Sequence, residues 1–406
     1  MTSQMQKEQY MRRAIELAKS AIGHTHPNPL VGCVVVKDGR IISEACHERY
    51  GEYHAERNAL MRCTKDTKGA ELYVTLEPCC HQGKTPPCTD IIIEKGISRV
   101  YVGSGDPNPK VAGKGYQILR SHGIEVEEGI LEKECLEMNE IFFHYITTNR
   151  PLVAMKYAMT LDGKIATYSG SSQWITGEQS REHVHYLRKK YCAIMAGIGT
   201  VLADNPMLNC RIQDGVDPVR IICDTHLRIH IDSNIVKTSG NIPTIIACDE
   251  NILAEGSTEE NSVRNMQGGT LQGTTQRTIQ NTIQNTTQKI QFLKEKGIKL
   301  IGVPLNSSDG QIDMKMLIER LGSEEKIDSI LVEGGGTINA SLIEQRLVDK
   351  VYCYIAPKIV GGRDSKTPVE GQGIALMKNA LTFTNGTIKT FGEDVLLEYD
   401  VENKRR

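Results

Sequence analysis

The sequence lacks the long apolar segments of a membrane protein. No apolar run approaches the roughly 20 residues that a helix needs to cross a bilayer. The N-terminal residues 1–11 are polar and lack the apolar core of a secretory signal peptide. These two absences predict a cytoplasmic protein with no membrane partner.

An excess of charge of one sign is also missing. The 406 residues include 48 Lys and Arg against 50 Asp and Glu, which gives a formal net charge of −2. No overall field attracts a polyanion, so we expect no nucleic-acid partner. The 12 cysteines are scattered along the chain and do not frame a small disulfide-rich domain. In a reducing compartment most of them are expected to be buried thiols, while a clustered few can bind metal.

Length and hydrophobic pattern predict two α/β domains. A single core does not usually serve so long a chain. Strands alternate with helices in the first third, which predicts a layered α/β architecture. The expected strands are 30–36, which pairs with 41–42 as a hairpin, 71–76 and 99–103. The expected helices are 7–22, 54–60, 88–95, 114–121 and 131–145.

A polar stretch that ends in proline, 147–151, marks the boundary between the two domains. We therefore expect a first domain over 1–147 and a second over 148–406. The pattern restarts after the boundary with further apolar segments. The expected strands of the second domain are 152–159, 192–197, 219–223, 244–248, 298–303, 329–332, 351–355 and 395–399.

One stretch of the second domain has a different composition. Residues 256–289 are rich in Thr, Gln and Asn and repeat the sequence Thr-Ile-Gln-Asn twice in succession. Such a tract cannot bury enough apolar surface to offset the entropy lost on ordering. The composition predicts a low-complexity insertion in a surface loop; a partner-binding segment is the alternative.

Three potential zinc ligands follow one another in the first domain. His54 and Glu56 stand two residues apart, Cys79 follows a proline, and Cys88 comes nine residues later. A catalytic zinc takes three protein ligands and leaves one position for water, whose pKa it lowers toward neutrality. A carboxylate beside that water can carry its proton to a leaving amine without binding the metal. This order of residues is typical of nucleobase deaminases, although their two cysteines are usually three residues apart.

Other interpretations of these residues remain open at this point. Cys80 and His81 are rival ligands by composition, and together with Cys79 and Cys88 they could form a closed structural zinc site. Buried thiols without metal are a further alternative. Chance alone also supplies many His-x-Glu pairs.

A second pattern lies at the end of the predicted strand 329–332. The residues 333–337 read Glu-Gly-Gly-Gly-Thr and open a predicted helix. Glycines allow the backbone to approach a phosphate, and a helix N-terminus attracts anions. Taken alone, the pattern fits a tight turn equally well. No Gly-x-Gly-x-x-Gly follows a first strand, so the sequence does not indicate a Rossmann domain.

Longer motifs are more specific than these patterns. The stretches 26–32 and 76–88 in the first domain, with 156–167, 174–176, 197–206 and 333–337 in the second, closely resemble the bifunctional deaminase/reductase family of riboflavin biosynthesis. The resemblance implies a cytidine-deaminase-like three-layer N-terminal domain and a dihydrofolate-reductase-like C-terminal domain. It also implies two consecutive reactions on a phosphorylated pyrimidine: hydrolytic deamination of 2,5-diamino-6-(5-phosphoribosylamino)pyrimidin-4-one, then NADPH-dependent reduction of the ribosyl group to ribityl.

The resemblance also assigns roles in the first domain, residue by residue. It makes His54, Cys79 and Cys88 the Zn²⁺ ligands and Glu56 the catalytic proton shuttle. It places Asn28, His47, His81 and Lys84 around the substrate. Without the motif, His81 and Lys84 would be read as ordinary residues of a surface loop.

For the reductase half, the resemblance implies two sets of residues. The NADPH side comprises Ala158, Trp174, Thr200, Asp204, Gly335, Gly336, Thr337, Ile338, Asn339, Ala340 and Ser341. The substrate side comprises Lys156, Ser172, Arg188, Leu208, Arg211 and Glu333. Lys156 and Asp204 are the candidates for catalytic help, and the two arginines suit a phosphorylated sugar. Arg188 lies in a run of charged residues that could equally be a solvated helix face, and a lone tryptophan such as Trp174 is usually part of a core.

Two rival functions and one expectation about assembly complete the prediction. A cytidine- or tRNA-adenosine-type deaminase fused to an unrelated domain would have the shorter cysteine spacing and would lack the second-domain motifs. A zinc-stabilised binding scaffold would not need Glu56. We also expect the protein to be a homo-oligomer.

Overall fold

The computed structural model describes residues 3–257 and 285–402, which form two compact units. The first unit comprises 1–151 with 326–328, and the second comprises 152–325 and 329–406. No helix in the described ranges is long and apolar enough to cross a membrane.

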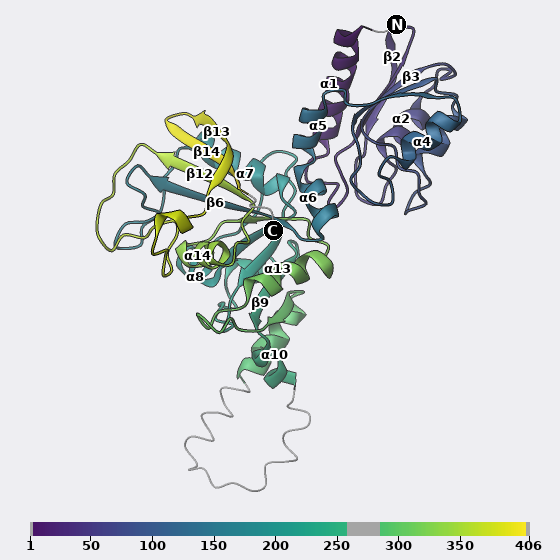
Figure 1. Cartoon of the computed structure of the whole chain (residues 1–406). Helices are drawn as coiled ribbons and strands as arrows, with labels where there is room; N and C mark the ends of the chain where they lie inside the picture. Colours follow the sequence, from purple (N-terminus) through teal and green to yellow (C-terminus); the bar gives the residue numbers. More distant parts are fainter. Residues whose placement is uncertain (1–2, 258–284, 403–406) are drawn as a thin grey trace, which may run out of the picture. The chain divides into compact units, whose positions relative to one another are not determined.

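The first unit is built on a five-stranded sheet of order β2-β1-β3-β4-β5 (Figure 1). β1 pairs antiparallel with β2 and β3, while β3, β4 and β5 run parallel. The strands are β1 (Gly32–Lys37), β2 (Arg40–Cys46), β3 (Glu71–Leu76), β4 (Arg99–Ser104) and β5 (Glu125–Glu127). The helices are α1 (Gln4–Ser20), α2 (Ala55–Arg62), α3 (Cys88–Glu94), α4 (Lys114–Ser121), α5 (Glu132–Met138) and α6 (Glu140–Thr148).

The strands of this sheet are apolar on both sides because helices cover both faces. On one face, Val35 and Val74 pack with residues of α2, α3 and α4. On the other face, Val34 and Tyr73 pack with residues of α1 and α5. A β-carbon at Gly32 would lie 1.8 Å from the Ala14 carbonyl oxygen, so glycine permits the close approach of α1 to β1. The result is the predicted three-layer unit.

The second unit contains a nine-stranded sheet of order β10-β9-β8-β7-β11-β6-β12-β14-β13 in the described residues. All neighbours are parallel except β14, which is antiparallel to β12 and to β13. The strands are β6 (Leu152–Thr160), β7 (Ala193–Gly197), β8 (Val219–Cys223), β9 (Thr244–Asp249), β10 (Lys299–Val303), β11 (Ser329–Val332), β12 (Lys350–Ala356), β13 (Phe383–Phe391) and β14 (Asp394–Val401).

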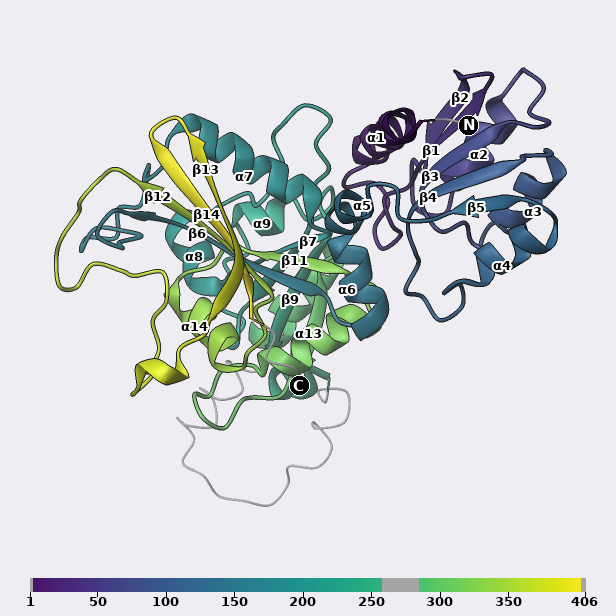
Figure 2. The same ribbon diagram turned by 45° about the horizontal axis from the view of Figure 1, so that its top comes forward.

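The helices of the second unit connect and cover these strands (Figure 2). They are α7 (Glu178–Lys190), α8 (Ile198–Asp204), α9 (Asn234–Lys237), α10 (Glu250–Ser257), α13 (Met314–Ser323) and α14 (Gly336–Glu344), with a further helix over 285–295 and a 3₁₀ turn at Met377–Asn379. Asp394 of β14 fixes the start of α7, because its carboxylate accepts hydrogen bonds from the Gly177 amide at 2.7 Å and the Ser180 hydroxyl at 2.6 Å.

Every predicted strand is present, and the predicted α/β class is confirmed for both units. The predicted helix at 131–145 is wrong as a single element, because α5 ends at Met138 and α6 begins at Glu140. The predicted boundary between 147 and 148 lies in the last turn of α6, whereas the two units divide after Pro151. Most of the predicted insertion at 256–289 lies outside the described residues; its last five residues, 285–289, begin a helix.

Candidate deaminase and reductase sites

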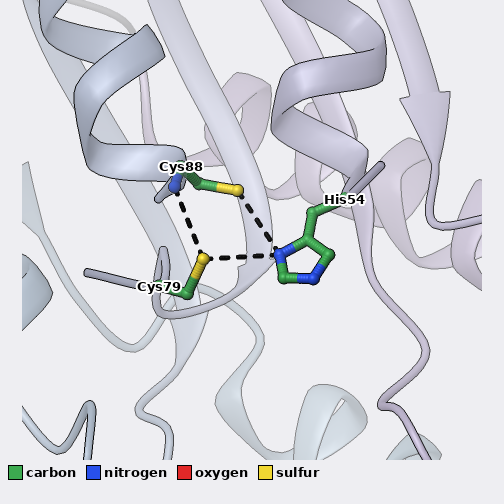
Figure 3. A group of neighbouring side chains, drawn as sticks. All are labelled: His54, Cys79 and Cys88. Atoms are coloured by element: carbon green, nitrogen blue, oxygen red, sulfur yellow. Dashed lines mark hydrogen bonds between the residues drawn. The ribbon is translucent and has the colours of Figure 1, made fainter. Parts of the chain in front are cut away.

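Three predicted metal ligands meet in the first unit. His54 precedes α2, Cys79 follows β3, and Cys88 opens α3. The Nδ1 atom of His54 lies 3.4 Å from the Cys79 sulfur and 3.5 Å from the Cys88 sulfur, as Figure 3 shows. A hydrogen bond from the Cys88 thiol lowers the pKa of Cys79 to about 4, which favours the thiolate that binds metal. One imidazole nitrogen and two sulfurs are a donor set that suits zinc with one position open.

Glu56 lies beside this triad without belonging to it. The side chain is 3% exposed, and its Oε2 atom has no hydrogen-bond partner among the described residues. Burial, followed by the nearby Cys79 sulfur, raises the pKa of Glu56 to about 7. A buried acceptor without a partner is costly, so a polar group arriving beside the metal position would satisfy it. The residues therefore fit a catalytic zinc better than a closed structural one.

The two rival ligands are placed elsewhere. The Cys80 thiol donates a hydrogen bond to the Lys110 carbonyl oxygen at 3.8 Å and is not part of the triad. His81 lines the adjoining cavity, where its Nδ1 atom is buried and has no hydrogen-bond partner in the described residues. The geometry thus separates the three residues that can hold a metal from His81, which lines the cavity beside them.

The predicted substrate residues line one cavity of about 340 Å³ together with His54, Glu56 and Cys79. The Nδ1–H group of His47 donates to the Tyr53 carbonyl oxygen at 3.0 Å, so its Nε2 atom accepts from the Asn28 amide at 3.1 Å. Burial lowers the pKa of His47, which keeps the ring neutral. A neutral His47 and Asn28 thus form a fixed polar wall for an uncharged ring.

Lys84 reaches the same cavity with its charge available. Its ammonium lies 3.9 Å from the centre of the Tyr50 ring, a cation–π contact that holds the chain in place. Lys84 therefore brings a positive charge to the wall of the cavity, a feature that suits an anionic group.

Sequence reasoning missed part of this cavity. Tyr50, Asp106 and Asn108 also line it, and burial raises the pKa of Asp106 to about 6. Asp106 follows β4, which runs parallel to β3, and Cys79 follows β3. Because the carboxyl ends of parallel strands share one edge, this placement was a usable signal.

The second unit brings three predicted residues into one buried ionic cluster. Glu333 follows β11 and accepts two hydrogen bonds from Arg188 of α7, Nε–Oε1 at 2.7 Å and Nη2–Oε2 at 3.0 Å. The ammonium of Lys156 on β6 lies 3.5 Å from Glu333 Oε2. Burial raises the pKa of Glu333, but the positive charges of Arg188 and Lys156 outweigh burial and lower this pKa to about 2. Arg188 is thus part of a buried ionic cluster and not of a solvated helix face.

The glycine run 334–336 leads from the carboxyl end of β11, an inner strand of the sheet, into the start of α14. β7 and β11 are adjacent parallel strands, and α8 and α14 follow directly from them, side by side in Figures 1 and 2. Gly335 is the N-cap of α14, and a β-carbon there would meet only Thr200 Oγ1, at 3.9 Å. Open space above a helix N-terminus fits a phosphate group.

The other predicted reductase residues differ in exposure. Ile338, Asn339 and Ala340 are buried in α14, and Leu208 is buried in the core of the unit, so their side chains face inward. Trp174 is 61% exposed, and the centre of its ring lies 4.7 Å from the Arg181 guanidinium, so the alternative that this lone tryptophan belongs to the core is wrong. Asp204 and Arg211 are exposed. Ala158 lies on β6 and Ser172 on the loop before α7. Gly336, Thr337 and Ser341 lie in α14.

Comparison with known families gives two matches, one in each of the two structural units. Residues 4–104 match the zinc-binding region of cytidine and deoxycytidylate deaminases. Residues 151–397 match the RibD C-terminal domain. Fold and site therefore define a zinc-dependent deaminase of the cytidine deaminase type that is joined to a reductase.

Relatives match over nearly the whole length. Riboflavin biosynthesis protein RibD of Actinobacillus pleuropneumoniae is 47% identical over 97% of this chain and 94% of its own, and that of Escherichia coli is 36% identical over 97% and 99%. The structure of Acinetobacter baumannii RibD, form 1, superposes with a TM-score of 0.80 at 31% identity, covering 99% of this chain and 100% of its own. A Thermotoga maritima structure, titled a diaminohydroxyphosphoribosylaminopyrimidine deaminase/5-amino-6-(5-phosphoribosylamino)uracil reductase, gives 0.78 at 36% identity over 98% and 99%.

The chain belongs to the RibD family, the bifunctional deaminase/reductases of riboflavin biosynthesis. The predicted family, the deaminase-like N-terminal fold and the zinc-binding character of the first unit are confirmed.

Proposed function

We propose that the cavity of the first unit deaminates a diaminopyrimidinone that carries a phosphoribosylamino chain, and that the second unit reduces the ribosyl group of the product with NADPH. The observation that carries the first half is the buried Oε2 atom of Glu56, which has no hydrogen-bond partner in the described part of the chain and lies beside the triad of His54, Cys79 and Cys88. That combination provides a proton carrier next to a metal position in a cavity large enough for a substrate.

His54, Cys79 and Cys88 would hold the zinc, which when bound supplies a water of lowered pKa at its open position. Glu56 takes a proton from the attacking water at Oε2 and delivers it to the departing amino group. A carboxyl with a pKa near 7 can both accept and donate a proton at neutral pH. Asn28 and His47 orient the ring, and His81 and Lys84 receive the phosphorylated chain.

The reductase role rests on the ionic cluster and the glycine turn. Glu333 holds Arg188 and Lys156 in place, and the two cations together exceed its single negative charge. The excess positive charge favours a phosphorylated sugar at this point. Gly335 at the start of α14 and Thr200 of α8 would hold the pyrophosphate of the cofactor, which when bound would supply hydride for reduction of the sugar.

Incubation of the enzyme with the diaminopyrimidinone substrate tests both halves. Mass analysis without NADPH should show replacement of the amino group by oxygen and nothing further, and addition of NADPH should then add two hydrogens. Reduction without NADPH, or failure of zinc-loaded enzyme to deaminate, contradicts the proposal.

We also propose a cytoplasmic homo-oligomer that does not bind nucleic acid. All 12 cysteines are free thiols, as expected in a reducing compartment. β13 ends the large sheet, and its residues 383–390 are all exposed, so a second copy can continue the sheet there. Light scattering at several concentrations tests this; a monomer throughout contradicts it.

A further inference from the structure

A buried aromatic group lies next to the ionic cluster of the second unit. Tyr354 of β12 is fully buried, and the Lys156 ammonium lies 5.8 Å from the centre of its ring. In the parallel pairing of β6 with β12, Tyr352 stands opposite Lys156 and Tyr354 opposite Ala158. Residues two apart on a strand share a face, so Tyr354 is the diagonal neighbour of Lys156 on one side of the sheet.

The ring of Tyr354 is itself held in place by His183 of α7. Its hydroxyl lies 2.6 Å from the Nδ1 atom of His183 on α7. The His183 ring stacks on Phe391 of β13, with centroids 4.5 Å apart and planes at 26°. Figures 1 and 2 show α7 beside β13 in both views. Three elements, α7, β12 and β13, therefore fix the orientation of one ring.

This arrangement is electrically neutral next to the ammonium. Burial lowers the pKa of His183 to about 4, and burial raises the pKa of Tyr354, so both groups are uncharged at neutral pH. The Tyr354 hydroxyl and His183 Nδ1 therefore share a hydrogen bond between two neutral groups, which adds no competing charge. The ring face, which is electron-rich, can attract the Lys156 ammonium.

The charge balance explains why Lys156 needs a second contact. Arg188 binds Glu333 with two hydrogen bonds of 2.7 and 3.0 Å, whereas Lys156 reaches Glu333 at 3.5 Å. The carboxylate therefore holds Arg188 more closely than it holds Lys156. A flexible ammonium with one long contact has several rotamers open to it, and catalysis requires one.

We propose that Tyr354, clamped by His183, is a positioning residue that holds the Lys156 ammonium against the reacting sugar in the reductase site. The inference rests on the proposed role of Lys156 in reduction. It adds a device to that site: an aromatic ring under the lysine, locked by a neutral tyrosine–histidine hydrogen bond.

A double-mutant cycle on the full-length, zinc-loaded enzyme tests this, with deaminated substrate and NADPH. Lys156→Met should lower the kcat of reduction at least about a hundredfold. Tyr354→Leu should lower it about tenfold, with little change in KM or in NADPH affinity. If Tyr354 acts through Lys156, the double variant should be no slower than Lys156→Met alone. Effects that multiply in the double variant overturn the proposal.

Conservative and matched variants separate positioning from general packing. Tyr354→Phe keeps the ring face but loses the hydrogen bond to His183, so Tyr354→Phe and His183→Leu should each give only a partial loss of kcat, within about threefold. Tyr191, another buried tyrosine of this unit, pairs its hydroxyl with Tyr352 at 3.1 Å. Tyr191→Leu should therefore lower stability without a loss of kcat. An equal loss in Tyr354→Phe and Tyr354→Leu, or in Tyr191→Leu, overturns the proposal.

Two outcomes distinguish this inference from the proposed function. If Lys156→Met reduces substrate normally, the role of Lys156 is wrong and the proposed reductase site fails. If Lys156→Met is inactive and Tyr354→Leu is normal, only the present inference fails. Should Tyr354→Leu not fold, as judged by lost deamination and NADPH binding, Tyr354→Met removes the ring with a more adaptable side chain.

Discussion

The two sites of this protein are assembled in different ways. In the first unit, the triad and Glu56 all lie within residues 54–88, at the start of α2, after the end of β3 and at the start of α3. In the second unit, Lys156, Arg188, Glu333 and Tyr354 come from β6, α7, the end of β11 and β12. A compact segment can preserve the first site by its local turns, while the second requires the whole sheet to form in register. Changes in the first site should therefore act on chemistry, and changes in the second on stability as well.

The largest expected effect is in the compact site. Glu56→Gln is nearly isosteric and removes the ability to accept a proton at Oε2, so deamination should fall by about 10²–10⁴-fold. Zinc content, measured by elemental analysis, should stay unchanged, and reduction of deaminated substrate should continue. Cys79→Ser is the contrast, because it should lose zinc as well as deamination. Loss of zinc from a folded Glu56→Gln protein would mean that Glu56 is a zinc ligand like Cys79 and not a proton carrier.

The second effect tests whether the dispersed site also carries stability. Glu333 has its pKa lowered to about 2, so its ionised form is favoured by folding. This contribution, on the order of 3 kcal/mol for such a shift, is complete above the ordinary Glu pKa of about 4.3 and is lost as pH falls toward 2. The protection factors of β6 and β11 amides, which are exchange rates corrected for the intrinsic pH dependence, should thus fall as pH drops through this range in the parent protein.

Glu333→Gln provides the control for that measurement. The variant leaves Arg188 and Lys156 without their counter-charge, so it should be less stable at neutral pH and should lose this part of the acid dependence. Equal acid dependence in parent and variant would show that Glu333 is not the group responsible.

A smaller effect should separate cofactor binding from packing in the glycine turn. At Gly335 a β-carbon has room, whereas at Gly336 it would lie 2.4 Å from Glu370 Cγ and 2.8 Å from the Thr367 carbonyl oxygen. Gly335→Val should therefore fold, keep deamination and bind NADPH about tenfold more weakly, a change near 1.4 kcal/mol. Gly336→Val should destabilise the second unit itself. Unchanged NADPH affinity in Gly335→Val, by titration, would place the pyrophosphate elsewhere.

The smallest effect is expected from the Thr-, Gln- and Asn-rich tract, which its composition predicts to be an insertion in a surface loop. Replacing residues 258–284 by a short Gly/Ser linker should leave both activities within about twofold, because its composition offers little apolar surface to bury. Assays of deamination and reduction on the shortened protein measure this directly. Loss of either activity in a folded variant would connect the tract to that site.

The sequence by itself determined the α/β class and the position of every predicted strand, and it limited the metal ligands to a few candidates. Periodic apolar runs predict strands because burial follows the alternation of side chains, and His54 with a cluster of cysteines is readable because zinc accepts few donor sets. β13 escaped prediction, since an exposed edge strand has no buried face to produce a pattern. The division of 131–145 into α5 and α6 depended on packing, because Cys135 faces one side of the sheet and Phe142 packs with the other.

Only the tertiary structure decided which polar residues meet. It turned Cys80 toward Lys110 and left His81 in the cavity, a choice that composition left open. It also placed Arg188 and Lys156 on Glu333, and Tyr354 with its partner His183 next to Lys156, from segments that no spacing rule connects. The physical reason is that strand order and register, which bring β6 between β11 and β12, arise from long-range pairing and not from local sequence.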